Sequence, residues 1–197
     1  AVRRAPGVVD FGAAKHVGSR AASRRSSPNR SVNRPNGSET MRRSGYCVAC
    51  EAKIRAFTLS TAIRAPGADV WRALVTLEDW PRWNTLVPSG QGAVRPGQVL
   101  AFRLRRVDGS LRDHRPTVLI VEPPRRLSLA ASFGHRSLVH LVHVFVIEEV
   151  DAETCRLVQT WEASGALVPV LWGLLQGVME RFAELGDDLA TWVEAGA

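Results

Sequence analysis

The stretch 168–193, VPVLWGLLQGVMERFAELGDDLATWV, decides the fold, because its apolar residues recur at alternating spacings of three and four. This spacing places them along one face of a helix roughly 40 Å long. The main row is Val168, Leu171, Leu175, Val178, Phe182, Leu185, Leu189 and Trp192. A second row beside it is Trp172, Met179 and Val193. An apolar face this wide has to be buried, and we expect it to lie across a sheet.

The segments before this helix have the pattern of strands. Residues 54–63 alternate apolar and polar side chains, which predicts a first strand. Pro66 and Asp69 then favour the start of a short helix, and Pro81 ends it. Further strands are expected at about 85–93, 98–107, 115–122, 126–133, 137–149 and 154–164.

Short turns separate the expected strands, and Asp108-Gly109 is the strongest hairpin signal among them. Consecutive strands joined by short turns pair antiparallel. The order strand, helix, strands, helix therefore predicts an α+β fold with its helices on one face of the sheet.

Charge is unevenly distributed along the 197 residues. Residues 1–56 hold 12 Lys or Arg and 3 Asp or Glu, whereas residues 57–197 hold 14 and 16. Residues 1–52, rich in Arg, Ser, Asn, Pro and Gly, are predicted to form a disordered basic tail before a domain at 53–197. Because the first Met is Met41, a further hypothesis places residues 1–40 upstream of the native start. The domain is close to neutral, which disfavours nucleic acid as a partner.

The cysteines and the motifs of the chain limit which disulfides, metal sites and cofactors are expected. Three cysteines are an odd number, which disfavours a disulfide framework and favours the cytoplasm, and the preference for Arg over Lys favours a GC-rich bacterial source. Cys47 and Cys50 form a lone CxxC, a weak redox or zinc signal. The most apolar window, 166–179, is too short to cross a membrane. With no cofactor or catalytic motif in the chain, we expect no cofactor and no metal.

Five stretches in the predicted domain resemble motifs of a known superfamily. They are Ala65-Pro66 through Leu74, Trp80–Asn84, Val121–Leu127, Phe145–Glu148 and Gly165–Pro169. In that order they resemble the START and polyketide-cyclase superfamily (SRPBCC) over about residues 54–194. The resemblance implies a helix-grip fold, in which a curved antiparallel sheet of six to seven strands wraps around the terminal helix, with short helices after strand one. It also implies a hydrophobic cavity that binds lipids, sterols, polyketides or other apolar molecules, and some members are cyclases or dehydratases.

Two polar residues on the expected inner face could act on a ligand. In the strand at 137–149, alternation places His143 inward and His140 on the opposite face, so the two cannot share a metal ion. An inward imidazole can bond a ligand carbonyl or move a proton. Gln159, on the inner face of the next strand, could orient a ligand. The alternative for both is a packing role in which each is hydrogen-bonded within the protein.

The remaining expected ligand contacts are large apolar side chains. The full predicted set is Trp80, Trp83, Phe102, Phe133, His143, Phe145, Gln159, Trp161, Trp172, Leu175 and Met179. Aromatic side chains of this size would serve a plain core equally well. Gly173 and Gly177, four residues apart, are expected to let ligand or sheet approach the terminal helix closely.

These observations predict a protein that binds a small hydrophobic or lipid-like ligand, for transport or sequestration, with no assigned catalytic set. The alternative is a polyketide-type cyclase or dehydratase in which His143 is the general base and Gln159 orients a substrate carbonyl. A third hypothesis is a protein-protein interaction module that uses the outer-face valines Val142, Val144 and Val146. The same valines are an alternative surface for a homodimer.

Overall fold

The computed structural model describes residues 54–196. The predicted basic tail, the hypothesis about Met41 and the CxxC motif lie outside the described residues. Within the described residues the chain forms eight strands, two long helices and three shorter helical segments. None of the described helices is both long and apolar enough to cross a membrane.

The large sheet has five antiparallel strands in the order β1-β8-β7-β6-β5. Their bounds are β1 Arg55–Ile63, β5 Thr117–Glu122, β6 Arg126–Phe133, β7 Val139–Glu149 and β8 Cys155–Ser164. In β8 every second residue from Cys155 to Ala163 is buried, which is the alternation of a strand with one covered face. This periodicity fixes which side chains point toward the helices.

A smaller sheet of three antiparallel strands, β2-β3-β4, lies beside the large one. Its strands are β2 Ser89–Gln91, β3 Ala101–Arg105 and β4 Leu111–His114. The hairpin between β3 and β4 turns at the predicted Asp108-Gly109, where Gly109 has a φ of 80°. A bridge between Val99 and Thr117 and a 2.8 Å hydrogen bond from the Gly97 amide to the Val118 carbonyl join the two sheets.

Strand β4 was not expected from the sequence, and β2 is shorter than expected. The β4 sequence, LRDH, is mostly polar and exposed, so it carries no alternation that would mark a strand. The predicted strand at 85–93 is reduced to Ser89–Gln91, because 84–88 is a loop that contacts α4 instead. The other predicted strands agree with the structure within a few residues, and the α+β helix-grip arrangement is confirmed.

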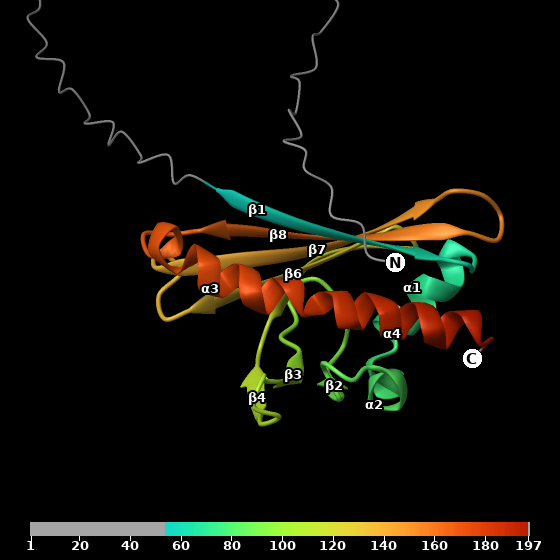
Figure 1. The fold of residues 1–197 in the computed structure, drawn as a ribbon, viewed down its shortest axis with the longest axis horizontal. Coiled ribbons are helices and arrows are strands. Elements are labelled where there is room, and N and C mark those ends of the chain that lie inside the picture. The colour runs from blue at the N-terminus through green and yellow to red at the C-terminus, as the bar shows by residue number, and fades with distance from the viewer. Residues whose placement is uncertain (1–53, 197) are drawn as a thin grey trace, which may run out of the picture. The chain divides into compact units, whose positions relative to one another are not determined.

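The short helical segments follow β1, as predicted: α1 Gly67–Val75, η1 Leu77–Asp79 and α2 Trp80–Trp83. The C-terminal helix consists of two segments, α3 Val168–Glu180 and α4 Phe182–Glu194, which meet at Arg181. Figure 1 shows α3 and α4 running one after the other along the same face of the large sheet. Arg181 ties their junction to the small sheet, since its guanidinium donates to the Arg105 carbonyl at 2.6 Å.

Burial of the terminal helix follows the expected stripe in α4 but departs from it in α3. In α4, Leu185 and Leu189 are buried. In α3, Met179 of the second row is buried, whereas Val178 of the main row is 45% exposed, so the expectation for Val178 is wrong. The buried residues of α3 are Val168 and Met179, eleven residues or about three turns apart, so the buried face of this segment follows them and Val178 lies to one side of it.

Gly186 of α4 lies in close contact with the large sheet. A Cβ placed on Gly186 would collide with Oγ1 of Thr61 in β1 and lie 3.3 Å from Nε2 of Gln159 in β8. By contrast, a Cβ on Gly173 or Gly177 would meet nothing within 4 Å. The expectation that Gly173 and Gly177 allow a close approach is therefore wrong, because both lie on the exposed side of α3.

We expect Gly186→Leu to lower the free energy of unfolding by about 1–3 kcal/mol, because the added side chain has to displace Thr61 or lift α4 from the sheet. Urea denaturation followed by circular dichroism measures this. The matched control is Gly177→Leu, where open space removes the clash and leucine's higher helix propensity keeps stability unchanged or raises it. Equal stability of Gly186→Leu and the wild type would contradict this account of the helix-sheet contact.

Candidate functional site

The candidate site lies where β7 and β8 pass beneath the junction of α3 and α4. His143 and Phe145 of β7 point to the same face as Gln159 and Trp161 of β8, with which they pair. The His143 ring is stacked on Trp161 at a centroid distance of 4.0 Å and lies 3.9 Å from Phe145. The Phe182 ring meets His143 and Trp161 edge-on, at 5.2 Å and 5.3 Å. An imidazole and an amide are therefore held among three aromatic rings.

The polar atoms of this group are only partly satisfied. Nε2 of Gln159 donates to the Phe182 carbonyl at 3.1 Å, which fixes the orientation of the amide. The amide oxygen Oε1 of Gln159 and the ring nitrogen Nε2 of His143 are both buried, and the Gln159 amide lies near enough to hydrogen-bond the His143 ring. A buried polar atom without a partner costs about 1–3 kcal/mol, so this contact between the two side chains is favoured.

Burial lowers the pKa of His143 from 6.5 to about 3. The nearby Gln159 amide opposes this shift, and an effect of that sign comes from an acceptor, which means that the amide oxygen faces the ring. His114 acts in the same direction as burial. The imidazole is consequently neutral at physiological pH and suited to hydrogen bonding, while its low basicity makes it a weak proton acceptor.

The structure does not bring all the predicted ligand contacts to this place. Trp80, Trp83 and Phe102 contact one another, with Trp80 stacked on Phe102 at 5.0 Å, in the main buried cluster that also includes Phe145. The Trp80 indole donates to the Leu74 carbonyl at 3.2 Å, as a core residue does. These three residues belong to the packing between α1, α2 and the small sheet.

The other predicted contacts surround the candidate site more closely. Met179 and Leu175 of α3 pack in one cluster with Trp161 and Leu59. Trp172 packs further along α3 against Val139, Ala163 and Val168, with the Arg55 guanidinium 5.5 Å from its ring. Phe133, at the end of β6, is 41% exposed and stacks on His114 of β4 at 6.0 Å.

Two residues of the site, Phe182 and His114, were not predicted from the sequence. Phe182 was assigned to the apolar stripe, and only its position at the junction of the two helix segments places it over His143. His114 lies in the unpredicted strand β4, so no pattern placed it on the inner face, where it pairs with Phe102. His140 is on the opposite face of β7 from His143, as predicted, and bonds Oγ of Ser132 at 3.0 Å.

The inner surface of the large sheet is sealed at one end and partly exposed at the other. Beneath α4, the inward side chains of Ile63, Leu157 and Ile147 are buried. Toward the far end of β6 and β7, the inward residues Ala131 and Leu141 keep exposed area. The partly exposed Leu171 and Leu175 of α3 pack in the same clusters as Leu141, and the partly exposed His114 of the small sheet stacks on Phe133.

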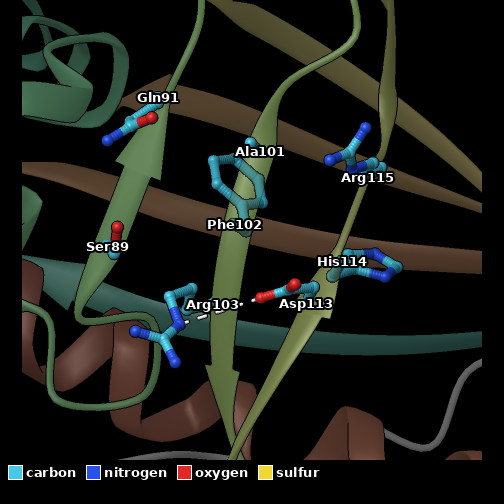
Figure 2. A pocket seen from close by; sticks show the side chains of 8 residues that line it. All are labelled: Ser89, Gln91, Ala101, Phe102, Arg103, Asp113, His114 and Arg115. Carbon is cyan, nitrogen blue, oxygen red and sulfur yellow. Dashed lines mark ion pairs between the residues drawn. The ribbon is translucent and has the colours of Figure 1, made fainter.

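Two hollows are present elsewhere on the described part of the chain. One, of about 180 Å³, lies on the small sheet (Figure 2), where Arg103 and Asp113 face each other at 3.7 Å. The other, of about 410 Å³, lies between β1 and α4 beside Arg64 and Glu194. Neither is lined by His143 or Gln159, so the cavity expected between sheet and helix is not one of these two. No cluster of three His, Cys, Asp or Glu side chains suited to a metal occurs within residues 54–196.

Comparison with known proteins agrees with the geometry. A family model described as polyketide cyclase/dehydrase and lipid transport matches residues 55–191, which is most of the chain. The protein belongs to this polyketide cyclase/dehydrase and lipid transport family. The resemblance to the START and polyketide-cyclase superfamily is thereby confirmed.

Members and structural neighbours of the family differ widely in sequence. A relative from Penicillium oxalicum, oxopyrrolidines biosynthesis cluster protein O, is 25% identical over 75% of this chain and 90% of its own length. The Zhui aromatase/cyclase from Streptomyces sp. R1128 has 17% identity and a TM-score of 0.59 over 72% of this chain and 94% of its own. Norcoclaurine synthase from Thalictrum flavum has 12% identity and a TM-score of 0.59 over 74% and 98%. The structural similarities establish a shared fold.

The lowered pKa of His143 predicts how the stability of this family member depends on pH. Between pH 6.5 and about 3 the unfolded chain binds a proton at this histidine and the folded chain does not, so stability falls as the pH drops through 6.5. Replacing His143 by Phe removes this contribution. We expect the stability of the variant relative to the wild type to rise by up to about 1.4 kcal/mol per pH unit below pH 6.5.

Urea denaturation at several pH values between 7.5 and 5 measures this difference. His140→Phe, on the other face of the same strand, is the matched control for replacing a histidine of β7 by phenylalanine. A His143→Phe variant with the same pH dependence as the wild type would show that folding does not lower the pKa of His143.

Proposed function

We propose that the protein binds a small hydrophobic ligand between the large sheet and the α3 segment of its terminal helix. The observation that supports this most directly is the partly exposed apolar inner surface around Ala131, Phe133 and Leu141. A protein that had only to fold would gain about 25 cal/mol for each Å² of this surface that it buried. Leaving it accessible is consistent with a surface that a ligand covers.

The ligand would enter between α3 and the β3–β4 hairpin. Residues from both elements line this side, with Leu175 on α3 and Leu104 and His114 on the small sheet. The junction at Arg181 and the Arg105 carbonyl joins the two elements at the inner limit of this region. The aromatic group around His143 lies next to it and would form the deep end of the binding region.

A cyclase or dehydratase acting in the same region is the second candidate. The closeness of the His143 imidazole and the Gln159 amide favours it, because a base and a group that orients the substrate are what such a reaction needs. The low pKa of His143 counts against it, since general bases work best when their pKa is near the working pH. Binding and carrying, with no chemical step, is therefore the function that we favour.

Other expectations from the sequence stay predictions. The outer-face residues Val142 and Val146 are half-buried and Val144 is buried, and nothing tests the interaction module or the homodimer that they were expected to support. The absence of nucleic acid among the partners, the bacterial source and the cytoplasmic location are likewise untested. Binding of a small hydrophobic molecule is the expectation to test first.

Filling the accessible inner surface should block binding. We expect Ala131→Trp to weaken binding of the apolar fluorescent probe N-phenyl-1-naphthylamine by about tenfold or more, equal to about 1.4 kcal/mol, because the indole occupies the space over β6. A fluorescence titration measures the dissociation constant. Ser132→Trp, the next residue on the opposite face of the same strand, is the matched control and should bind the probe like the wild type.

Failure of the wild-type protein to bind the probe, or equal binding by both tryptophan variants and the wild type, would refute the proposed site. A second test uses native mass spectrometry of the protein purified from its own host, which identifies any natural ligand. A co-purified molecule retained by Ser132→Trp and lost by Ala131→Trp would support the proposal.

A further inference from the structure

The small sheet carries a hollow that the proposed function does not use. In β3, Phe102 is buried whereas Ala101 and Arg103 on either side of it are exposed, so these two side chains project from the outer face of the sheet. The hollow has a volume of about 180 Å³, and besides residues of the outer face Phe102 and His114 contribute to its lining. It is distinct from the inner surface of the large sheet on which an apolar ligand is proposed to bind.

One row of side chains on the outer face runs from Gln91 of β2 through Ala101 of β3 to Arg115. Gln91 pairs with Ala101. Arg115 lies opposite Ala101, because a 2.9 Å hydrogen bond from the Leu100 amide to the Pro116 carbonyl continues the register of β3 and β4. Figure 2 shows Arg115 beside Ala101. Since alanine is much smaller than its two neighbours, this row is hollow at its centre.

A second row beside the first consists of Ser89, Arg103 and Asp113. Diagonal neighbours on one face of a sheet are about 7–8 Å apart, so Arg103 and Arg115 flank the hollow over Ala101 from two sides. Nε of Arg103 lies 3.7 Å from Oδ1 of Asp113, and the two side chains are 56% and 82% exposed. An ion pair as long and as exposed as this is weak, which leaves the Arg103 guanidinium able to bind another anion.

The groups around the hollow are mainly hydrogen-bond donors. Within residues 54–196, the side chains of Ser89, Gln91 and Arg115 form no hydrogen bond or ion pair. A guanidinium only donates, and amide and hydroxyl groups donate as well as accept. Among the lining residues two guanidinium groups face a single carboxylate, that of Asp113. Both the excess of donors and the excess of positive charge favour an anion.

We propose that this hollow is a binding site for a phosphate group, held by Arg103 and Arg115 with Ser89 and Gln91 as neutral donors. The oxygens of a phosphate point in tetrahedral directions, so the group can meet one guanidinium fork and still reach donors on a second strand. A carboxylate has two oxygens in one plane, which a single guanidinium occupies. Because the hollow is open to solvent, salt weakens the binding.

The first test titrates the full chain with inorganic phosphate at constant ionic strength and follows the backbone amides and the arginine Nε groups by ¹⁵N NMR. We expect saturable shifts in β2, β3 and β4. Arg115→Gln should weaken binding by about fivefold or more, because it removes a charged donor. Ala101→Leu should abolish binding, since the larger side chain fills the hollow. Asp113→Asn should strengthen binding by about twofold or more, because it removes a competing anion from Arg103.

The matched control is Arg125→Gln, an exposed position in the turn between β5 and β6. It removes the same charge away from the hollow and should keep the wild-type affinity. Absence of saturable shifts in the small sheet overturns the phosphate site. Equal losses of affinity in Arg125→Gln and Arg115→Gln also overturn it, because they reveal only a general attraction of the anion to a basic protein.

Inorganic phosphate and the phosphate of a lipid headgroup present the same chemistry, and a second experiment separates them. It measures co-sedimentation of the full chain with phosphatidylcholine vesicles that contain or lack phosphatidic acid. Binding only to vesicles with phosphatidic acid, lost in Arg115→Gln and kept in Arg125→Gln, supports the site and assigns it to a lipid headgroup. Saturable binding of inorganic phosphate without co-sedimentation supports the site and assigns it to a soluble phosphate. Neither result depends on the apolar site under α3.

Discussion

The contact of α4 with β1 and β8 at Gly186 is the constraint on which the fold and the candidate site both depend. Without a side chain at this position, the helix backbone approaches Thr61 and Gln159 directly. Leu185 and Leu189 fill the space on the sheet side of α4. The same approach brings the Phe182 carbonyl within 3.1 Å of the Gln159 amide, so the contact that seats the helix also aims Oε1 of Gln159 toward His143.

Polar anchors reinforce this contact along α4. Asp188 accepts hydrogen bonds from the amide and the hydroxyl of Thr85, at 2.8 Å and 2.6 Å. At its C-terminal end, Glu194 pairs with Arg64. At the start of α3, the Ala166 and Leu167 amides donate hydrogen bonds to the loop before β7, and the outer face of α3 exposes the apolar residues Val170, Leu174 and Val178. The two segments of the terminal helix therefore differ in how much apolar surface they expose.

Much of this arrangement could be predicted from the sequence because periodicity carries it. Alternation in β7 and β8 was enough to place His143 and Gln159 inward and His140 outward, and the 3-4 spacing identified Leu185 and Leu189 as the buried face of α4. The rotation of the terminal helix against the sheet could not be predicted from the sequence. Gly173 and Gly177 look like close-contact positions, but which glycine meets the sheet depends on how the helix is rotated, and that glycine is Gly186.

The division of the terminal helix has a consequence for how such a protein can change over evolution. Substitutions in α4 act on the contact that determines whether the chain folds, whereas substitutions in α3 alter the surface over Leu141 and Trp161 with little effect on that contact. The surface over Leu141 and Trp161 can therefore change during evolution without loss of the contact that stabilises the fold. Chains that share only 12% or 17% of their residues with this one retain its architecture.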